Sequence, residues 1–201
     1  MVFFHYLNSM NKFSFIFLKV FLLTFSFEIL CNSCQMIEGQ KKCQDIIPKI
    51  VVDYRSIIEN DFESYKKKSD QQLNILLDII MSDGELYALL SGNYYRVHFP
   101  LDFDQTTSEF SFAKETYYGY TIIDNNTCVI NINKNVPSNK IKLLLGKLSF
   151  ADDKALIDDY IRNNFYISDY DPYYCLYRLD LELGNATLVE KGYSIKSLKD
   201  Y

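Results

Sequence analysis

The spacing of apolar residues predicts an amphipathic helix between positions 46 and 65. Apolar side chains recur there every three or four residues and fall on one stripe of a helical surface. They are Ile46, Ile47, Ile50, Val51, Tyr54, Ile57, Ile58, Phe62 and Tyr65. Asp45 precedes the stripe as a candidate N-cap, and Pro48 is tolerated in a first helical turn.

A second, shorter helix is expected to begin at Asp70, so that residues 46–80 are predicted to be mainly helical. Its apolar residues again lie three or four positions apart. They are Leu73, Leu76, Leu77 and Ile80. The sequence Ser82-Asp83-Gly84 then predicts a turn.

Beyond residue 84 the apolar period changes to two, which predicts antiparallel β-hairpins. We expect hairpins at 85–99 (turning at Ser91-Gly92), at 117–132 (turning at Asp124-Asn125-Asn126) and at 173–191 (turning at Gly184-Asn185). Short helices are predicted at 141–148 and at 152–165, where Asp152 and Asp153 suit a helix N-terminus. The expected fold is therefore α+β, an N-terminal amphipathic helical segment followed by antiparallel hairpins.

The first 33 residues have the layout of a secretory signal peptide. Lys12 and Lys19 precede an uncharged apolar stretch at 20–27, and Cys31 and Ser33 are small residues near its end. Lys19 and Glu28 interrupt the longer apolar run on either side of this stretch. The uncharged part is therefore shorter than the about 20 residues of a membrane-spanning helix. We predict cleavage after Ser33 and a single secreted, extracellular domain at 34–201, attached to a membrane only if the leader is retained.

Cleavage would leave four of the five cysteines, Cys34, Cys43, Cys128 and Cys175. An even number in a secreted chain implies two disulfides, and of the three possible pairings we expect Cys34–Cys43 and Cys128–Cys175. The sequence has no Cys-x-x-Cys pair, and His98 would be the one histidine left, so no metal site is predicted.

Two glycosylation sequons agree with export, Asn125-Asn126-Thr127 and Asn185-Ala186-Thr187. Both acceptor residues, Asn125 and Asn185, fall at predicted turns. The net charge of −5 becomes −6 without the leader, which disfavours nucleic acid as a partner.

No catalytic constellation and no cofactor motif stand out in the sequence. A Gly-x-Ser-x-Gly elbow and a glycine-rich phosphate loop are both missing. Acidic pairs at Asp102/Asp104, Asp169/Asp171 and Asp180/Glu182 leave open a carboxylate-dependent hydrolase or transferase. We favour a non-enzymatic binding protein for an extracellular protein or small ligand.

Clustered tyrosines are the candidate binding residues, because exposed tyrosines often anchor binding surfaces. They are Tyr94, Tyr95, Tyr117, Tyr118, Tyr173 and Tyr174.

Two tyrosine-rich segments are similar to each other, one headed by Asp78 and one by Asp158. The first continues to Gly92-Asn93-Tyr94-Tyr95-Arg96, and the second to Tyr173-Tyr174 and then Gly192-Tyr193-Ser194. This pattern resembles the hemopexin repeat, although Ser194 stands where that family has proline. The resemblance implies a small β-propeller that binds proteins or, in some members, haem. A haem or lipid carrier, with His98 or a tyrosine as axial ligand, is thus a further alternative.

Overall fold

The computed structural model describes residues 42–62, 70–93, 101–112, 116–162 and 173–198. The predicted signal peptide at 1–33 lies outside the described residues. Contacts group residues 42–201 into one unit.

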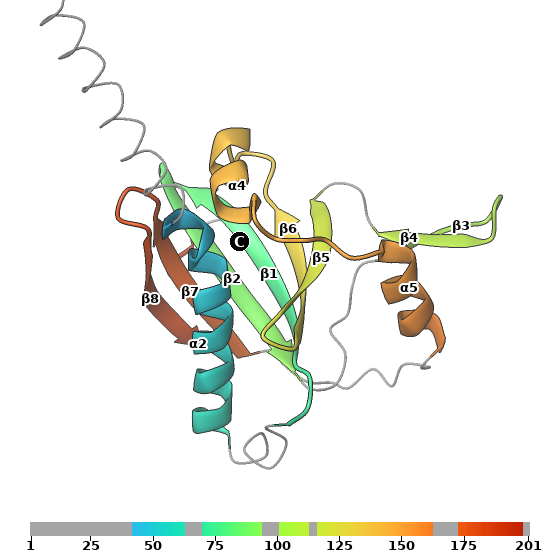
Figure 1. Cartoon of the computed structure of the whole chain (residues 1–201), viewed down its shortest axis with the longest axis horizontal. Coiled ribbons are helices and arrows are strands. Elements are labelled where there is room, and N and C mark those ends of the chain that lie inside the picture. The colour runs from blue at the N-terminus through green and yellow to red at the C-terminus, as the bar shows by residue number, and fades with distance from the viewer. Residues whose placement is uncertain (1–41, 63–69, 94–100, 113–115, 163–172, 199–201) are drawn as a thin grey trace, which may run out of the picture. The chain divides into compact units, whose positions relative to one another are not determined.

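The predicted first helix is present as α2 (Ile46–Asp61). Asp45 occupies the N-cap position, although its side chain makes no capping hydrogen bond. The helix ends where Phe62 turns to extended backbone, with φ −128° and ψ 110°. Its buried stripe is Ile46, Ile47, Ile50, Val51, Tyr54 and Ile58. The opposite side carries polar residues, and α2 lies across one face of a β-sheet (Figure 1).

The sheet has six strands in the order β5-β6-β1-β2-β7-β8 and is not closed. The strands are β1 (Asn74–Ser82), β2 (Glu85–Asn93), β5 (Tyr117–Ile123), β6 (Asn126–Ile132), β7 (Tyr173–Asp180) and β8 (Asn185–Gly192). All neighbours pair antiparallel except β1 and β6, which are parallel. A separate two-stranded hairpin consists of β3 (Leu101–Asp104) and β4 (Glu109–Phe112).

The helix predicted from Asp70 is wrong, because residues 74–82 form strand β1. Ile75, Leu77 and Ile79 face the buried side that α2 covers, while Ile80 is buried on the opposite side. A strand that is buried on both faces has apolar residues at successive positions, so its sequence does not alternate. Some of these apolar residues lie three or four positions apart, which is the spacing that also predicts a helix.

The first hairpin therefore forms one strand earlier than predicted, between β1 and β2. Asp83 and Gly84 make its two-residue turn, both with positive φ (50° and 80°), as the type I′ turn requires. The predicted Ser91-Gly92 turn is wrong, since both residues lie within β2. Gly92 is needed for close approach instead of a turn: a Cβ there would lie 2.3 Å from the carbonyl oxygen of Asn74.

The other two predicted hairpins are confirmed as β5–β6 and β7–β8. The first turns at Asp124 and Asn125, whose φ angles are 48° and 59°. The two short helices are confirmed with shifted bounds, as α4 (Ser138–Leu145), which ends before Gly146, and α5 (Asp153–Arg162). The β3–β4 hairpin was not predicted.

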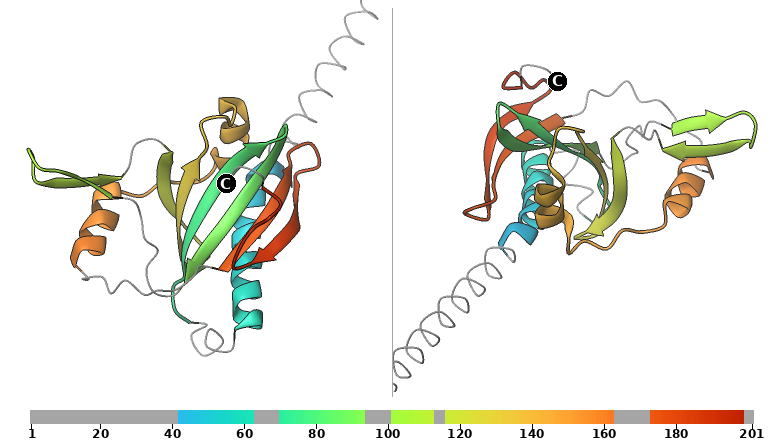
Figure 2. Two further views of the ribbon diagram at one scale, coloured as in Figure 1. Left: turned by 180° about the vertical axis from the view of Figure 1, so that it is seen from behind. Right: turned by 90° about the horizontal axis from the view of Figure 1, so that it is seen from above.

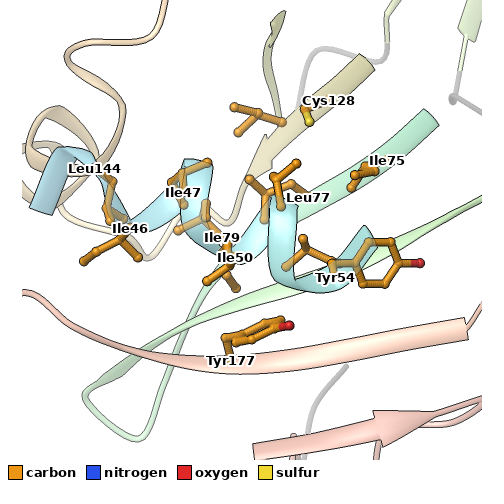
Figure 3. Packing of buried hydrophobic residues seen from close by; sticks show 14 of the residues in the cluster. Ile46, Ile47, Ile50, Tyr54, Ile75, Leu77, Ile79, Cys128, Leu144 and Tyr177 are labelled. Carbon is orange, nitrogen blue, oxygen red and sulfur yellow. The ribbon is translucent and has the colours of Figure 1, made fainter. Parts of the chain in front are cut away.

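The main core lies between α2 and the sheet, and Figure 3 shows the side chains of α2 directed toward the strands. Tyr54 is fully buried there and donates a 2.9 Å hydrogen bond to the carbonyl oxygen of Tyr173. Tyr177, 2% exposed, donates one of 2.7 Å to the carboxylate of Asp53. These bonds satisfy the hydroxyls that burial would otherwise penalise, at about 1–3 kcal/mol each.

A mixed helix-and-sheet architecture is thus present, whereas the blades of a propeller are not seen in the described residues. The two segments that resembled hemopexin repeats also differ in structure. Asp78 lies in strand β1, and Asp158 lies in helix α5.

Candidate binding site

A cleft of about 520 Å³ opens between β4, the beginning of β5 and α5. We call it the Tyr117 cleft, after the one predicted binding residue that lines it. Its principal lining residues are Glu109, Ser111, Phe112, Tyr117, Asp153, Lys154, Ile157 and Asp158.

Two aromatic rings form one wall of this cleft. The rings of Phe112 and Tyr117 stack with centroids 4.1 Å apart and an interplanar angle of 18°. Phe112 is 6% exposed and belongs to a small apolar cluster with Tyr120 and Val129, against which Ile157 packs. This cluster ties the cleft to the outer face of the sheet and keeps its aromatic wall in place.

The hydroxyl of Tyr117 donates a hydrogen bond to the carboxylate of Asp153. Burial, and then this bond, raise the pKa of Tyr117 far above its ordinary value, so the phenol stays protonated. Asp153 is held in the first turn of α5, which Asp152 caps by accepting a 3.0 Å hydrogen bond from the backbone N–H of Lys154. The helix N-terminus stabilises the carboxylate of Asp153.

The charge of the cleft is predominantly acidic. Glu109, Asp153 and Asp158 contribute carboxylates, and Lys154 is the one cation among the lining residues. Lys154 lies 3.4 Å from Asp158 in an exposed i,i+4 pair, which is a weak interaction. An acidic cleft with an aromatic wall suits a positively charged group carried on an apolar stem.

The other predicted tyrosines do not share this surface. Tyr118 is 47% exposed and packs edge-on against Phe150, with centroids 5.2 Å apart. Tyr173 is buried and donates a 3.1 Å hydrogen bond to Asp61. Tyr174 is half-buried on the sheet face opposite α2. Tyr94 and Tyr95 lie outside the described residues.

The acidic pairs are largely committed to turns. Asp104 accepts hydrogen bonds from the backbone N–H groups of Thr106 (2.7 Å) and Thr107 (3.4 Å), which lower the pKa of its carboxyl. Asp180 likewise accepts from the backbone after it, at 3.0 and 2.9 Å. Asp102 lies in β3, and Glu182 is exposed in the β7–β8 turn. Asp169, Asp171 and His98 lie outside the described residues.

Both sequon asparagines are exposed. Asn125 lies in the β5–β6 turn with φ 59°, and Asn185 is the first residue of β8. Thr187 is exposed as well, whereas Thr127 is buried at 7% exposure. The two acceptor asparagines are thus accessible in the folded chain, and glycosylation stays a prediction.

The predicted disulfides are not formed. Cys43, Cys128 and Cys175 are buried free thiols, so the Cys128–Cys175 bond is wrong. Cys128 is paired in register with Ile75 on β1, and Cys175 with Leu90 on β2, so that two strands separate the cysteines. Neighbouring strands lie about 4.8 Å apart, which puts these cysteines roughly 14 Å apart, well beyond the about 7 Å limit of a disulfide.

Cys43 is also free, and its thiol donates to the carbonyl oxygen of Leu181 at 2.8 Å. The predicted Cys34–Cys43 bond is therefore not present, although Cys34 itself lies outside the described residues. Burial raises the pKa of Cys128 and of Cys175 to about 12, so both are poor nucleophiles.

No group of three potential metal ligands occurs in the described part of the chain. Among the described helices, none has the length and apolar character needed to cross a membrane. The comparisons with family models, with curated proteins and with solved structures found no match to this chain.

Sequence reasoning did not identify Glu109, Phe112, Asp153 and Asp158 as binding residues of the cleft. Asp153 was noted only as a helix start. The alternation Glu109-Phe-Ser-Phe112 was a signal for strand β4, but it is too short to predict a strand by itself.

Proposed function

We propose that this protein is an exported binding protein whose Tyr117 cleft holds a basic side chain of an extracellular protein partner. The observation that carries the proposal is the combination of the stacked Phe112–Tyr117 wall with the carboxylates of Glu109, Asp153 and Asp158. Export rests on the leader at 1–33 and is supported by the exposure of Asn125 and Asn185 at turns.

An arginine or lysine of the partner is the group that fits this cleft best. Its methylene stem can pack on the aromatic wall, and its charge can meet Glu109 and Asp158 at the rim. A cation near an aromatic face contributes about 0.5–2 kcal/mol, and each exposed ion pair about 0–1 kcal/mol. The charge should therefore be worth roughly 1–3 kcal/mol, or about 5- to 150-fold in affinity.

Binding is favoured over catalysis by the state of the cleft's own groups. Tyr117 remains protonated and already donates to Asp153, so it offers no base. Both histidines of the chain, His5 and His98, lie outside the described residues. No specific observation favours the carboxylate hydrolase or the haem carrier.

A pair of peptides tests the charge requirement directly. Acetyl-Leu-Arg-Leu-amide and its citrulline counterpart have nearly the same shape, but citrulline is uncharged. We expect the arginine peptide to shift the NMR signals of Tyr117 and Phe112 and to bind at least fivefold more tightly. Equal binding of both peptides, or shifts that avoid the cleft, would refute the proposal.

Charge reversal of the rim supplies the complementary test. Glu109→Lys with Asp158→Lys should abolish the preference for the arginine peptide without disturbing the fold, because Glu109 is exposed and the side chain of Asp158 is half-exposed. Glu182→Lys with Asp70→Lys is the matched control, since it adds the same charge at two exposed turns away from the cleft lining. Detection of the mature chain in the culture medium tests export separately.

A further inference from the structure

The last described segment, residues 194–198, lies on the face of the sheet opposite α2 (Figure 2). We call it the C-terminal strap. Leu198 is 8% exposed and packs with Ile80, Leu89 and Leu176, which come from β1, β2 and β7. Ile195, Tyr87 and Tyr174 pack around this cluster. The apolar surface beneath the strap, made of Ile80, Leu89, Leu176, Tyr87 and Tyr174, is called the strap patch below.

The strap is also held by one carboxylate. Glu190 on β8 accepts hydrogen bonds from the backbone N–H of Lys196 (3.0 and 3.1 Å) and from the backbone N–H of Ser197 (2.9 Å). The hydroxyl of Ser197 donates a further bond of 2.5 Å. Together these bonds lower the pKa of Glu190, and bonds to an ionised acceptor are stronger than neutral ones.

These contacts are of the kind that a protein makes with a bound peptide. Two apolar side chains three positions apart, Ile195 and Leu198, supply the anchors, while Glu190 recognises the backbone between them. Within the described residues no strand pairs with the strap. The side chains of Lys196 and Ser197 are exposed, so neither of them packs on the strap patch.

The chain can leave the patch without disrupting the sheet. Strand β8 ends at Gly192, whose φ of 151° favours glycine and around which a Cβ would meet nothing closer than 3.9 Å. Tyr193, which follows, is 55% exposed, and its ring packs edge-on against those of Tyr173 and Phe62, with centroids 5.4 and 6.3 Å away. With Tyr193 held against Tyr173 and Phe62, the strap can leave the patch from Ser194 onward while the end of β8 stays in place.

We propose that the strap patch is a protein-binding surface that the chain's own strap occupies and blocks. Its partner is a polypeptide segment with two large apolar residues three positions apart and with free backbone N–H groups between them for Glu190. Such a segment displaces the strap by taking over the same contacts. This surface is separate from the Tyr117 cleft, and it explains why Tyr174, predicted as an exposed anchor, is covered.

The test uses the full-length chain with Leu198→Asp, which should release the strap, and a fluorescent peptide with the sequence of residues 192–198. We expect this variant to bind the peptide saturably and at least tenfold more tightly than the wild type, whose patch is occupied. Adding Glu190→Gln should weaken binding at least fivefold. Lys196→Ala is the control, since its backbone bond to Glu190 is retained, and it should behave as wild type.

Equal peptide binding by the wild type and by a folded Leu198→Asp variant would overturn the proposal. A concentration-dependent dimer of the wild type that Leu198→Asp abolishes would also overturn it, by assigning the patch to a second copy of the chain. Hydrogen exchange of the wild type gives a measurement that needs no variant. The amides of Lys196 and Ser197 should exchange at least tenfold faster than those of β7, and exchange only through global unfolding would contradict a displaceable strap.

Discussion

Replacement of Asn126 by alanine should be among the most destabilising single changes in this chain. Asn126 is fully buried at the beginning of β6. Its carbonyl oxygen accepts hydrogen bonds from Arg55 of α2 (2.7 Å) and from the backbone N–H of Leu73 (3.2 Å). Its amide group donates to the backbone oxygens of Ile123 (3.2 Å) and Asp124 (2.8 Å). One side chain thereby joins the helix, the entry to β1 and the β5–β6 turn.

The magnitude follows from the groups that would lose their partners. The N–H of Leu73 is buried and would have no acceptor, at a cost of about 1–3 kcal/mol. Arg55 would lose a charge-assisted bond worth about 1.5–3 kcal/mol, although it keeps its bonds to Glu59 and to the backbone oxygen of Gln71. Water can reach the exposed Asp124, so we expect a net loss of about 3 kcal/mol.

Urea unfolding followed by circular dichroism measures this loss. With a slope of about 1–3 kcal/mol per molar, the midpoint should fall by roughly 1–3 M while the slope stays unchanged. Asn139→Ala, at an exposed position of α4, is the control and should remain within about 0.5 kcal/mol of the wild type. A loss below about 1 kcal/mol for Asn126→Ala would refute the reasoning. The change also keeps the sequon at Asn125, whose middle position accepts alanine.

Three further predictions concern buried or paired groups. Tyr177→Phe removes a buried 2.7 Å bond to a carboxylate of α2 and should cost about 1–3 kcal/mol in the same assay, whereas a neutral effect would contradict that bond's contribution. Cys128 and Cys175 should resist iodoacetamide at pH 8 in the native protein and react in denaturant, as mass spectrometry would show; native labelling within minutes would disprove their burial. The pKa of Asp61 is lowered by its hydrogen bond to Lys191, so this pair stabilises the fold above the ordinary aspartate pKa and the contribution is lost as pH falls through the folded pKa. Asp61→Asn should therefore lessen the acid-induced decline of the melting temperature, and an unchanged decline would count against the pair.

The sequence predicted those elements that have one buried and one exposed side. Helix α2 was recognised because its polar side leaves a clear stripe, and the β5–β6 hairpin because Asp124-Asn125 fits a tight turn. Strand β1 was not predicted, because it lies inside the sheet with apolar contacts on both faces. The one feature of its sequence that indicated a strand was its isoleucines, such as Ile75 and Ile79, since β-branched residues favour strands.

The Tyr117 cleft could be predicted only in part. Tyr117 was identified as an aromatic residue suited to binding, but its partners come from β4 and α5. The sequence contains no local pattern that brings Phe112 and Asp158 to the same place, because their proximity depends on tertiary packing. The packing of the strap was not predicted for the same reason, since Leu198 contacts residues of three different strands.

The buried thiols alter what supports the proposal of export. The sequence predicts paired cysteines, as in an oxidising compartment, yet Cys128 and Cys175 are free thiols in an apolar core, with two strands between them. There they act as small apolar side chains, whose contribution is packing and not cross-linking. Their raised pKa and lack of exposure make both thiols poor nucleophiles. The leader and the two exposed sequons therefore carry that proposal without help from the cysteines.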